Sequence, residues 1–404
     1  MTAYDRKQYI GLFGFGVVGE SLYHVISNSP SSNADIIKIC IKNPHKPRSL
    51  PPNMFCHEAS QVISDPAINL VVELIDNAEE AFHIVCSALR AGKSVVSGNK
   101  KMLATHMDEL VKLQEETGAA LLYDASACGS IPVIRNLEEY YDTDLLLSIT
   151  GILNGSSNYI LSQAFHEQHS YEEALAKAQE LGFAESNPAL DVDGLDAVYK
   201  LTLLTLHGFG LLVDPDSIFR SGIRGIKPAD IRFARERGYR IKPIAQARKF
   251  NGNKLALFVM PKLVTPDEYI YNVENEYNGV VIEGTYYDKQ FMFGKGAGGF
   301  PTGSSVLSDI MARTHQYRYE YKKRRYLTPP APDNDIQMEV YFSYRNPNDL
   351  QLMDFIEITE QYGSRDHYFV IGRVSLQKLF DISDSLSSSG IFLACIRLVD
   401  DQRT

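Results

Sequence analysis

A glycine-rich turn near the start of the chain, Gly14-Phe-Gly-Val-Val-Gly19, constrains the fold more than any other feature. It directly follows residues 9–13, an apolar run typical of a strand, and it precedes residues 20–26, which have helical spacing. In this order the first glycine permits a tight turn, the second lets a ligand approach the backbone, and the third lets the helix pack on the strand. The pattern predicts that a nucleotide pyrophosphate binds at the helix N-terminus.

Strand and helix patterns alternate over the residues that follow. Residues 36–41, 70–75, 94–97 and 119–123 are apolar runs of strand length, and residues 78–91 and 102–117 have helical spacing. This alternation predicts an α/β fold with a doubly wound parallel sheet of the Rossmann type. Asp76-Asn77 and Ser97-Gly-Asn-Lys100 follow two of the strands, at the edge where ligands of such sheets bind.

The loop after the second strand bears on the choice of dinucleotide. An NAD site usually has Asp or Glu there, whereas this chain has Lys42-Asn-Pro-His-Lys-Pro-Arg48. Basic side chains suit the 2′-phosphate of NADP, and an ordinary solvated loop explains them equally well. We therefore expect NADP or NAD as cofactor, with NADP favoured and with Lys42 among its contacts.

A cluster of acidic residues precedes a single lysine, Lys200. Its members are Glu185, Asp191, Asp193 and Asp196. Asp196 and Lys200 lie four residues apart, which places them on one face of a helix. Asn187-Pro188 and Gly194 interrupt the backbone before that helix, so Glu185 and Asp191 are expected on the entering loop. Such a cluster could hold a substrate ammonium beside a proton donor, although an isolated segment of this kind is more often a solvated acidic turn.

Composition excludes several classes of partner. The net charge of −10 argues against nucleic acid and anionic membranes. No apolar run reaches the length of a membrane span, and residues 1–8 lack the apolar core of a signal peptide. The five cysteines lack CxxC spacing and are expected as buried thiols in a reducing compartment, the cytoplasm. We expect a small-molecule substrate, with no nucleic-acid or membrane partner.

Six segments carry a family resemblance. In chain order they are Gly14–Gly19, Val95-Val-Ser-Gly-Asn-Lys-Lys-Met-Leu-Ala104, Ala125-Ser-Ala-Cys-Gly-Ser-Ile-Pro132, Gly151-Ile-Leu-Asn-Gly-Ser-Ser-Asn-Tyr-Ile-Leu161, residues 178–200, and Gly296-Ala-Gly-Gly-Phe-Pro-Thr302. Together they resemble the homoserine dehydrogenase family over residues 9 to about 315. The resemblance implies NAD(P)-dependent interconversion of L-homoserine and L-aspartate 4-semialdehyde, on the route to threonine and methionine.

By position, the resemblance assigns roles to individual residues. Lys200 resembles the family's acid/base lysine, and we favour it as proton donor because Asp196 on the preceding turn can orient it. Lys100 resembles the lysine between nicotinamide and substrate, and Glu185 the residue that takes the substrate's α-ammonium. The other substrate positions are Asp191, Asp196, Gly155 and Ser156. The cofactor positions are Gly14, Phe15, Gly16, Val17, Val18, Gly19, Lys42, Asn77, Lys100 and Gly298.

The chain departs from the family pattern at uncharged positions. Phe183 stands where the family often has Tyr, and Ser156-Ser157 replaces the frequent Thr-Thr. Phe183 alone supports an alternative, a dehydrogenase of a related hydroxy acid or semialdehyde. An alternative from another class is a non-catalytic dinucleotide-binding sensor, which would need none of the acidic residues around Lys200.

The small-residue loop at 124–131 is a candidate ion site. In the family a sodium-like ion binds to backbone carbonyls here, and by position the ligands would be Asp124, Ala127, Gly129 and Ile131. An ordinary turn explains the loop equally well. Histidines near the acidic cluster lack ligand spacing, so no zinc site is expected.

The patterns divide the chain into three domains and a linker. Residues 1–132, completed by about 300–316, are expected to form the dinucleotide-binding domain, and residues 133–299 an α/β substrate and dimerisation domain. Residues 317–334 are expected as a solvated linker. Residues 335–404 form a small α+β module in which 350–362 have helical spacing; by resemblance it is a degenerate regulatory domain or a dimer-stabilising appendage. The resemblance also implies a homodimer or homotetramer.

Overall fold

The computed structural model describes residues 7–29, 31–143, 145–167, 169–250, 253–365, 367–388 and 390–399. The chain forms two compact units, and each combines two separate stretches of sequence. Unit 1 comprises Met1–Asp142 and Lys295–Arg325, and unit 2 comprises Thr143–Gly294 and Tyr326–Thr404. Each unit is built on one sheet.

Unit 1 contains a parallel sheet of six strands in the order β3-β2-β1-β4-β5-β6. The strands are β1 Gln8–Phe13, β2 Ala34–Cys40, β3 Phe55–Cys56, β4 Leu70–Glu73, β5 Ser94–Ser97 and β6 Leu121–Leu122. The strand order reverses between β1 and β4, which is the point where dinucleotides bind to such sheets. The predicted doubly wound parallel sheet is confirmed.

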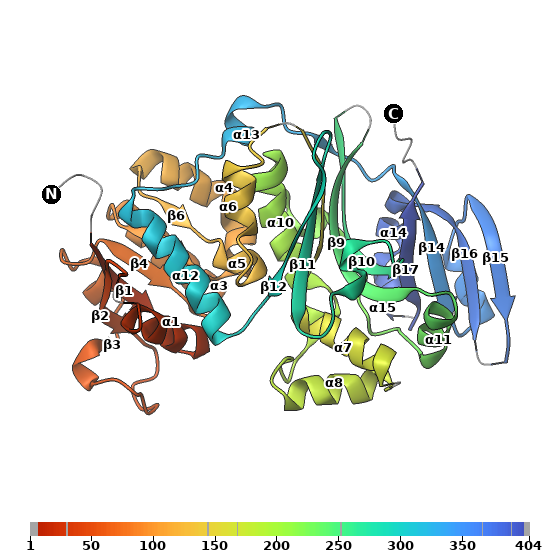
Figure 1. The fold of residues 1–404 in the computed structure, drawn as a ribbon, viewed down its shortest axis with the longest axis horizontal. Helices are drawn as coiled ribbons and strands as arrows, with labels where there is room; N and C mark the ends of the chain where they lie inside the picture. Colours follow the sequence, from red (N-terminus) through yellow and green to blue (C-terminus); the bar gives the residue numbers. More distant parts are fainter. Residues whose placement is uncertain are drawn as a thin grey trace. The chain divides into compact units, whose positions relative to one another are not determined.

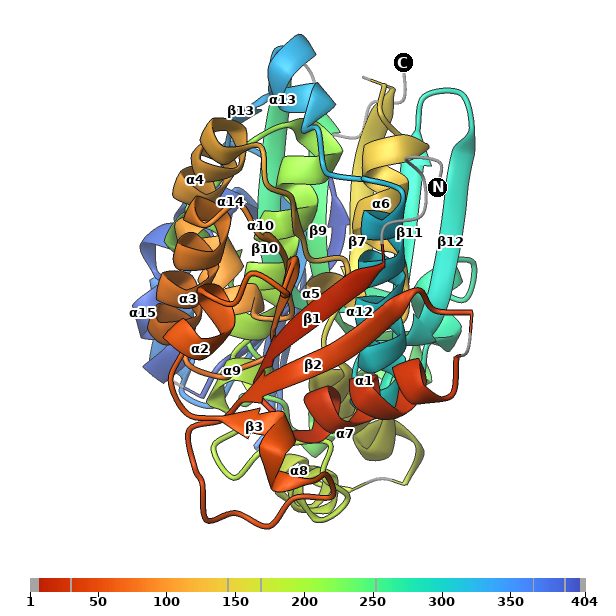
Figure 2. The same ribbon diagram turned by 90° about the vertical axis from the view of Figure 1, so that its left-hand side faces the viewer.

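Helices cover the sheet of unit 1 on both faces. They are α1 Val17–Ser27, α2 Ser60–Ile63, α3 Ala78–Arg90, α4 Lys100–Thr117, α5 Ala125–Cys128, α6 Val133–Glu139 and α12 Gly299–Thr314, with the 3-10 helix η1 Pro52–Met54. Helix α1 packs on α12 and α3 packs on α4, and Figure 2 shows the two pairs on opposite sides of the strands. The strands β4 and β5 are therefore buried along their whole length.

Unit 2 contains an 11-stranded mixed sheet in the order β12-β11-β7-β9-β10-β17-β14-β16-β15, with β8 and β13 paired to β10. The strands are β7 Leu146–Ile152, β8 Phe219–Arg220, β9 Arg240–Phe250, β10 Lys254–Val264, β11 Tyr277–Gly284, β12 Asp288–Lys295, β13 Ala331–Pro332, β14 Gln337–Tyr344, β15 Glu357–Gly363, β16 Tyr368–Ser375 and β17 Phe392–Leu398. Helices and strands are thus mixed in this unit, as expected for an α/β substrate domain.

The helices of unit 2 are mostly short, and the long α10 runs through its core. They are α7 Gly155–His166, α8 Tyr171–Glu180, α9 Ala189–Val192, α10 Leu195–Phe209, α11 Pro228–Glu236, α14 Leu376–Asp381 and α15 Ser383–Ser388, with the 3-10 helices η2 Pro215–Ser217, η3 Tyr269–Asn272 and η4 Pro347–Leu352. Ile149 of β7 packs against Gly208 of α10, so Ile149 faces this helix and its two neighbours Ser148 and Thr150 face away from it.

The C-terminal segment continues the sheet of unit 2. Strand β17 pairs with β10 at Cys395 and Lys262, and β14, β16 and β15 extend the sheet beyond it (Figure 1). Tyr341, Phe369 and Phe392 of this segment belong to the same apolar core as Tyr159 of α7 and Val192 of α9. The segment is therefore part of the fold that supports α7 and α9.

The helix expected over residues 350–362 is wrong. Residues 347–352 form η4, and β15 pairs antiparallel with β16. Strand β15 lies at the sheet edge and most of its residues are exposed. An edge strand exposed on both faces lacks the alternation that marks a half-buried strand, so its scattered apolar residues mimic helical spacing.

The stretch expected as a solvated linker is packed at its start. Tyr319 and Tyr321 are almost fully buried in unit 1, and the ring of Tyr319 meets that of Tyr123 at a centroid distance of 5.0 Å. The basic run forms the helix α13 Lys322–Tyr326, in which Lys323 is buried and Arg325 pairs with Glu115. The basic side chains are thus satisfied by the protein.

In the described residues, the structure contains no helix that is both long and apolar enough to cross a membrane.

Candidate active site

The glycine turn of unit 1 has the geometry of a pyrophosphate cradle. Gly14 has φ +91°, and a Cβ there would lie 2.6 Å from the Leu74 carbonyl oxygen. A Cβ on Gly16 would meet no atom within 4 Å, so open space faces this residue. Gly16 also begins α1 without a side-chain cap. The turn therefore leaves room for a phosphate at an uncapped helix N-terminus, and the residues fit a dinucleotide.

Three other predicted cofactor residues of unit 1 lie at the N-termini of helices. Asn77 is exposed and caps α3 by accepting a hydrogen bond from the Glu80 amide. Lys100 is half-buried and is the first residue of α4. Gly298 precedes α12, and α12 packs on α1, the helix of the glycine turn.

The basic loop after β2 presents its residues unequally. The Lys42 side chain is 85% exposed, and its amine lies 3.5 Å from the Glu80 carboxylate. Arg48 instead folds back and donates a 2.6 Å hydrogen bond to the Phe15 carbonyl oxygen, inside the glycine turn. Arg48 is therefore the basic residue of the loop that the structure joins to the cradle.

In unit 2 the structure brings Lys200 and Asp196 together, as their spacing on α10 predicted. The Lys200 amine lies 2.7 Å from the Asp196 carboxylate and donates a 2.6 Å hydrogen bond to the Leu153 carbonyl oxygen. Lys200 is 7% exposed and Asp196 is 4% exposed. An ammonium has three N–H donors, so within the described part of the chain one remains for a ligand.

Asn154 joins a second carboxylate of the cluster, Asp191, to this pair, and sequence reasoning missed it. Its amide nitrogen donates hydrogen bonds to Asp191, at 2.7 Å, and to Asp196, at 2.9 Å. Its amide oxygen accepts from the Ser157 amide and so caps α7. The signal was available: Asn154 directly precedes the substrate-loop residue Gly155, and Asn is a strong N-cap residue.

The other predicted substrate residues lie around α7 and α9. A Cβ on Gly155 would lie 2.6 Å from the Glu276 carbonyl oxygen, so only glycine fits there. The Ser156 hydroxyl donates to the Phe183 carbonyl oxygen, and the Phe183 ring packs on Tyr159. Glu185 is exposed in the loop between α8 and α9. The structure thus holds Gly155 and Ser156 tightly and leaves the Glu185 carboxylate open to solvent.

The loop at 124–131 in unit 1 is buried and polar. The Asp124 carboxylate accepts hydrogen bonds from the Ile134 and Arg135 amides, and its own amide donates to Asp309. Burial and the charge of Asp124 together raise the pKa of Asp309 to about 7, against the opposing effect of Arg135. Among the described residues no group of three His, Cys, Asp or Glu side chains could hold a metal ion.

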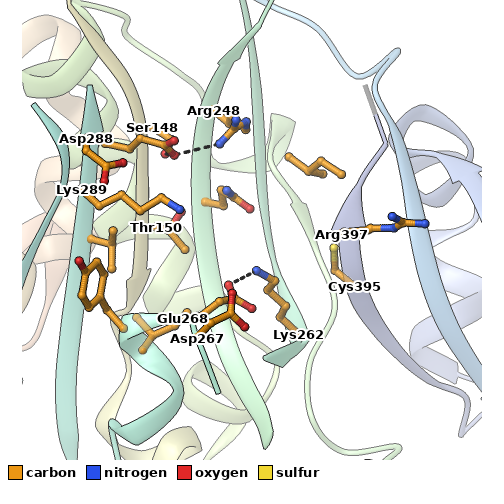
Figure 3. Close-up of a pocket in the computed structure, with 16 residues that line it drawn as sticks. Ser148, Thr150, Arg248, Lys262, Asp267, Glu268, Asp288, Lys289, Cys395 and Arg397 are labelled. Carbon is orange, nitrogen blue, oxygen red and sulfur yellow. Dashed lines mark hydrogen bonds and ion pairs between the residues drawn. The ribbon is translucent and has the colours of Figure 1, made fainter. Parts of the chain in front are cut away.

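A separate cavity of about 440 Å³ lies on the sheet of unit 2 (Figure 3). Ser148 and Thr150 of β7 line it, and these residues point to the sheet face opposite Ile149 and α10. Charged pairs surround it, including Arg248 with Glu283 and Lys262 with Glu268. The cavity is therefore distinct from the cluster around Lys200.

Comparison with known proteins identifies the family. The family model described as "Homoserine dehydrogenase" matches residues 132–311, and the model of its NAD-binding domain matches residues 14–124. The homoserine dehydrogenase of Bacillus subtilis is 33% identical over 358 residues, which cover 86% of this chain and 80% of that protein. This chain belongs to the homoserine dehydrogenase family. It is accordingly an NAD(P)-dependent oxidoreductase that acts on a CH–OH group.

Solved structures of the family support the same assignment. The homoserine dehydrogenase of Thiobacillus denitrificans superposes with a TM-score of 0.85 at 26% identity, over 97% of this chain and 98% of that one. That match extends over most of the C-terminal segment. A hyperthermophilic archaeal homoserine dehydrogenase in complex with NADPH has a TM-score of 0.65 at 25% identity, over 78% of this chain and 99% of that one.

Proposed function

We propose that this homoserine dehydrogenase interconverts L-homoserine and L-aspartate 4-semialdehyde with Lys200 as the acid/base group. The observation that carries the proposal is the buried ion pair of Lys200 with Asp196. When bound, the nicotinamide accepts or supplies the hydride. In the direction of homoserine, negative charge develops on the aldehyde oxygen, and the third N–H of Lys200 donates the proton to it. In the other direction Lys200 takes the proton from the hydroxyl.

Asp196 and Leu153 fix the position from which Lys200 acts. Two of the three N–H bonds of Lys200 point at the oxygens of Asp196 and Leu153, so the direction of the third N–H bond is fixed. Because the ammonium and the carboxylate are both buried, solvent screens their attraction little. After it has donated its proton, Lys200 takes another from solvent while Asp196 and Leu153 hold the side chain in place.

The remaining charged residues bind rather than transfer protons. The exposed Glu185 carboxylate is suited to bind the substrate's α-ammonium. Asp191 accepts a hydrogen bond from the Asn154 side chain, which also donates to Asp196. Gly155 and Ser156 contribute backbone at the start of α7. In unit 1, Lys100 at the start of α4 polarises the carbonyl or contacts the cofactor.

NADP is the proposed cofactor in preference to NAD. Support comes from the basic loop, which contains Lys42 and Arg48 where an NAD site usually has an acidic residue. The relative solved with NADPH adds to this support. Assays with homoserine and each cofactor test the preference: equal kcat/KM with NAD and NADP would remove it.

Two further features follow from the resemblance. We propose a sodium ion at the backbone carbonyls of Asp124, Ala127, Gly129 and Ile131; replacing sodium by an organic cation should lower cofactor-dependent activity. We also propose a cytoplasmic homodimer that pairs through the sheet face with the 440 Å³ cavity, where Tyr269 lines the cavity and stacks on the exposed ring of Phe291. Light scattering on Tyr269→Asp should then report a smaller mass than the wild type.

Replacing Lys200 tests the central proposal. Lys200→Ala should lower kcat by at least about 10²-fold, because proton transfer by a positioned group is worth that much, while cofactor affinity stays unchanged. Lys177→Ala, at an exposed lysine of α8, is the matched control. A Lys200→Ala enzyme that turns over at the wild-type rate would assign the proton to another group. A wild type that reduces neither cofactor with homoserine would overturn the reaction itself.

A further inference from the structure

A carboxylate with no assigned role is buried at the end of β4. Glu73 is 0% exposed, and its neighbours in register are Phe13 of β1 and Ser97 of β5. One of its oxygens accepts a 2.7 Å hydrogen bond from the Ile75 amide, and the other accepts a 2.6 Å bond from the Ser97 hydroxyl. Burying a carboxylate is costly, so these two bonds must offset the loss of water.

The hydrogen bonds of Glu73 close a ring between two loops. The Ser97 hydroxyl accepts from the Asn99 amide, at 3.2 Å, and the Asn99 side chain donates to the Ile75 carbonyl oxygen, at 3.0 Å. The Asn99 side-chain oxygen caps α4 through the Met102 amide. The ring thus joins the loop after β4, which leads to Asn77, to the loop after β5, which leads to Lys100.

The loop after β4 also touches the glycine turn. A Cβ on Gly14 would lie 2.6 Å from the Leu74 carbonyl oxygen, and a Cβ on Gly98 would lie 2.9 Å from the Leu74 side chain. Both contacts are tight, so a shift of this loop moves the backbone on either side of it. All three segments lie at the carboxyl ends of β1, β4 and β5, where a dinucleotide binds.

We propose that Glu73 is a positioning residue for the dinucleotide: its carboxylate ties the loops after β4 and β5 together and so places Asn77 and Lys100 toward the cofactor. This inference rests on the proposed function of unit 1 as the cofactor site. The carboxylate itself touches neither substrate nor cofactor. Its effect reaches the cofactor through Ser97, Asn99 and the loop of Leu74.

The tie depends on ionised Glu73, which makes it sensitive to pH. Burial, together with the charge of Asp76, raises the pKa of Glu73 to about 7, against the hydrogen bonds from Ser97 and Ile75, which lower it. The strands on either side of Glu73 place Phe13 and Ser97 next to it, and neither side chain is charged. The helix that follows Ser97, α4, begins with the charged residue Lys100. A protonated carboxyl must donate from one oxygen, so the Ser97 hydroxyl would face two donors and lose the acceptor for its own hydrogen.

Stability and cofactor binding should therefore respond to pH in opposite senses. The pKa of Glu73 lies at about 7 in the folded chain, above its ordinary value of 4.5, so the folded state holds the proton more tightly. The resulting stability is present at low pH and is lost as the pH rises through about 7. Cofactor affinity, which depends on the ionised tie, should weaken as the pH falls through the same range.

The experiment compares the wild type with Glu73→Gln between pH 6 and pH 8 by NADPH fluorescence titration and by thermal unfolding without cofactor. As the pH falls, the wild-type Kd for NADPH should rise about 3- to 10-fold more than the variant Kd does. This factor is the effect of one hydrogen bond. At pH 8 the variant should bind NADPH more weakly than the wild type, with a higher Kd. Its Kd should not change with the titration of residue 73, because glutamine does not ionise. The variant should also gain stability relative to the wild type as the pH rises. Comparing the two proteins cancels titration of the NADPH phosphate.

Glu116→Gln, at an exposed carboxylate of α4, is the matched control. Ser97→Ala repeats the binding test where Glu73→Gln does not fold. The proposal fails if an active wild type and Glu73→Gln bind NADPH with the same affinity at each pH. Absence of homoserine-dependent reduction by the wild type would instead count against the proposed function.

Discussion

Two glycines of the same turn should respond differently to alanine. At Gly16 the backbone has φ −88° and a Cβ would meet open space, so Gly16→Ala should melt like the wild type. A methyl group there would still keep phosphate from the backbone. NADPH affinity should therefore fall by about tenfold or more, as expected for the loss of a charge-assisted hydrogen bond. Fluorescence titration measures the affinity and calorimetry the melting.

Gly14→Ala is the counterpart. Gly14 has φ +91°, and a Cβ there would lie 2.6 Å from the Leu74 carbonyl oxygen. Alanine should therefore lower the free energy of unfolding by about 1–3 kcal/mol, the cost of a strained residue. Normal NADPH affinity in Gly16→Ala would show that the open space in front of Gly16 is not the phosphate site.

Asn154 should matter for substrate and not for cofactor. It is the common partner of Asp191, Asp196 and the start of α7, so Asn154→Ala should release two carboxylates and Gly155 together. We expect kcat/KM for homoserine to fall about 10²-fold, the usual effect of a small misplacement of catalytic groups, with NADPH affinity unchanged. Steady-state kinetics with both ligands measures the split.

Gln163→Ala, at a half-buried amide of the same helix, controls for damage to α7. An equal loss in both variants would mean that α7 as a whole, rather than the amide of Asn154, is responsible.

At this scale, local spacing decided what could be predicted. Asp196 and Lys200 were predictable because one helical turn separates them. The bond from Asn154 to Asp196 spans 42 positions and depends on where the fold places the start of α7 relative to α10, which periodicity does not encode. Glu73 was hidden for another reason: a single acidic residue in an apolar strand gives no hint that two loops bind to it.

Among the elements, those of unit 1 were largely predictable and those of unit 2 less so. Parallel strands buried on both faces are continuous apolar runs, and β1, β4 and β5 appear as such in the sequence. The edge strand β15 has few buried residues and gave a false helix. The joining of β17 to β10 rests on contacts distant in sequence, so the sequence suggested a separate module where the structure has one continuous sheet.

The C-terminal segment should be needed for the stability of unit 2. The Tyr341 hydroxyl donates a 2.7 Å hydrogen bond to the fully buried Asp230 of α11, and His367 lies 3.2 Å from the same oxygen. Tyr341→Phe leaves this buried carboxylate short of one donor, which should cost about 1–3 kcal/mol. Thermal unfolding measures the loss, and Tyr362→Phe, at an exposed ring of β15, is the control.

Truncation after Pro332 should likewise unfold unit 2, because it removes Tyr341, Phe369 and Phe392 from the core shared with α7. We expect weak or absent threonine inhibition, and this must be measured on the full chain. A truncated protein that stays folded and active would show that the segment is dispensable.

For the whole molecule, the chemistry is divided between two units that each have their own sheet. The cradle at Gly14–Gly19, the tie of Glu73 and the amine of Lys100 belong to unit 1, and the pair of Asp196 and Lys200 belongs to unit 2. Sequence order interleaves them, since residues 295–325 return to unit 1 after the substrate segment. Gly299 and Gly303 of α12 suit this return, because a Cβ on either would crowd α1, on which α12 packs.

This division predicts where each ligand should slow hydrogen exchange. NADPH at about 100 times its Kd should stabilise the cofactor-bound state by about 2.7 kcal/mol, and the protection should concentrate at residues 14–20, 75–80 and 97–103. Homoserine with the oxidised cofactor should add protection at residues 153–158 and 185–200. Amides of β14 and β16, already buried in the sheet, should change little. Gly16→Ala should reduce the first stabilisation to about 1.4 kcal/mol or less at the same NADPH concentration, since a tenfold weaker affinity leaves NADPH at about 10 times its Kd. Asn154→Ala should abolish the second pattern while keeping the first. Protection at 185–200 by NADPH alone, equal to that with homoserine, would contradict the assignment of separate ligand sites to the two units.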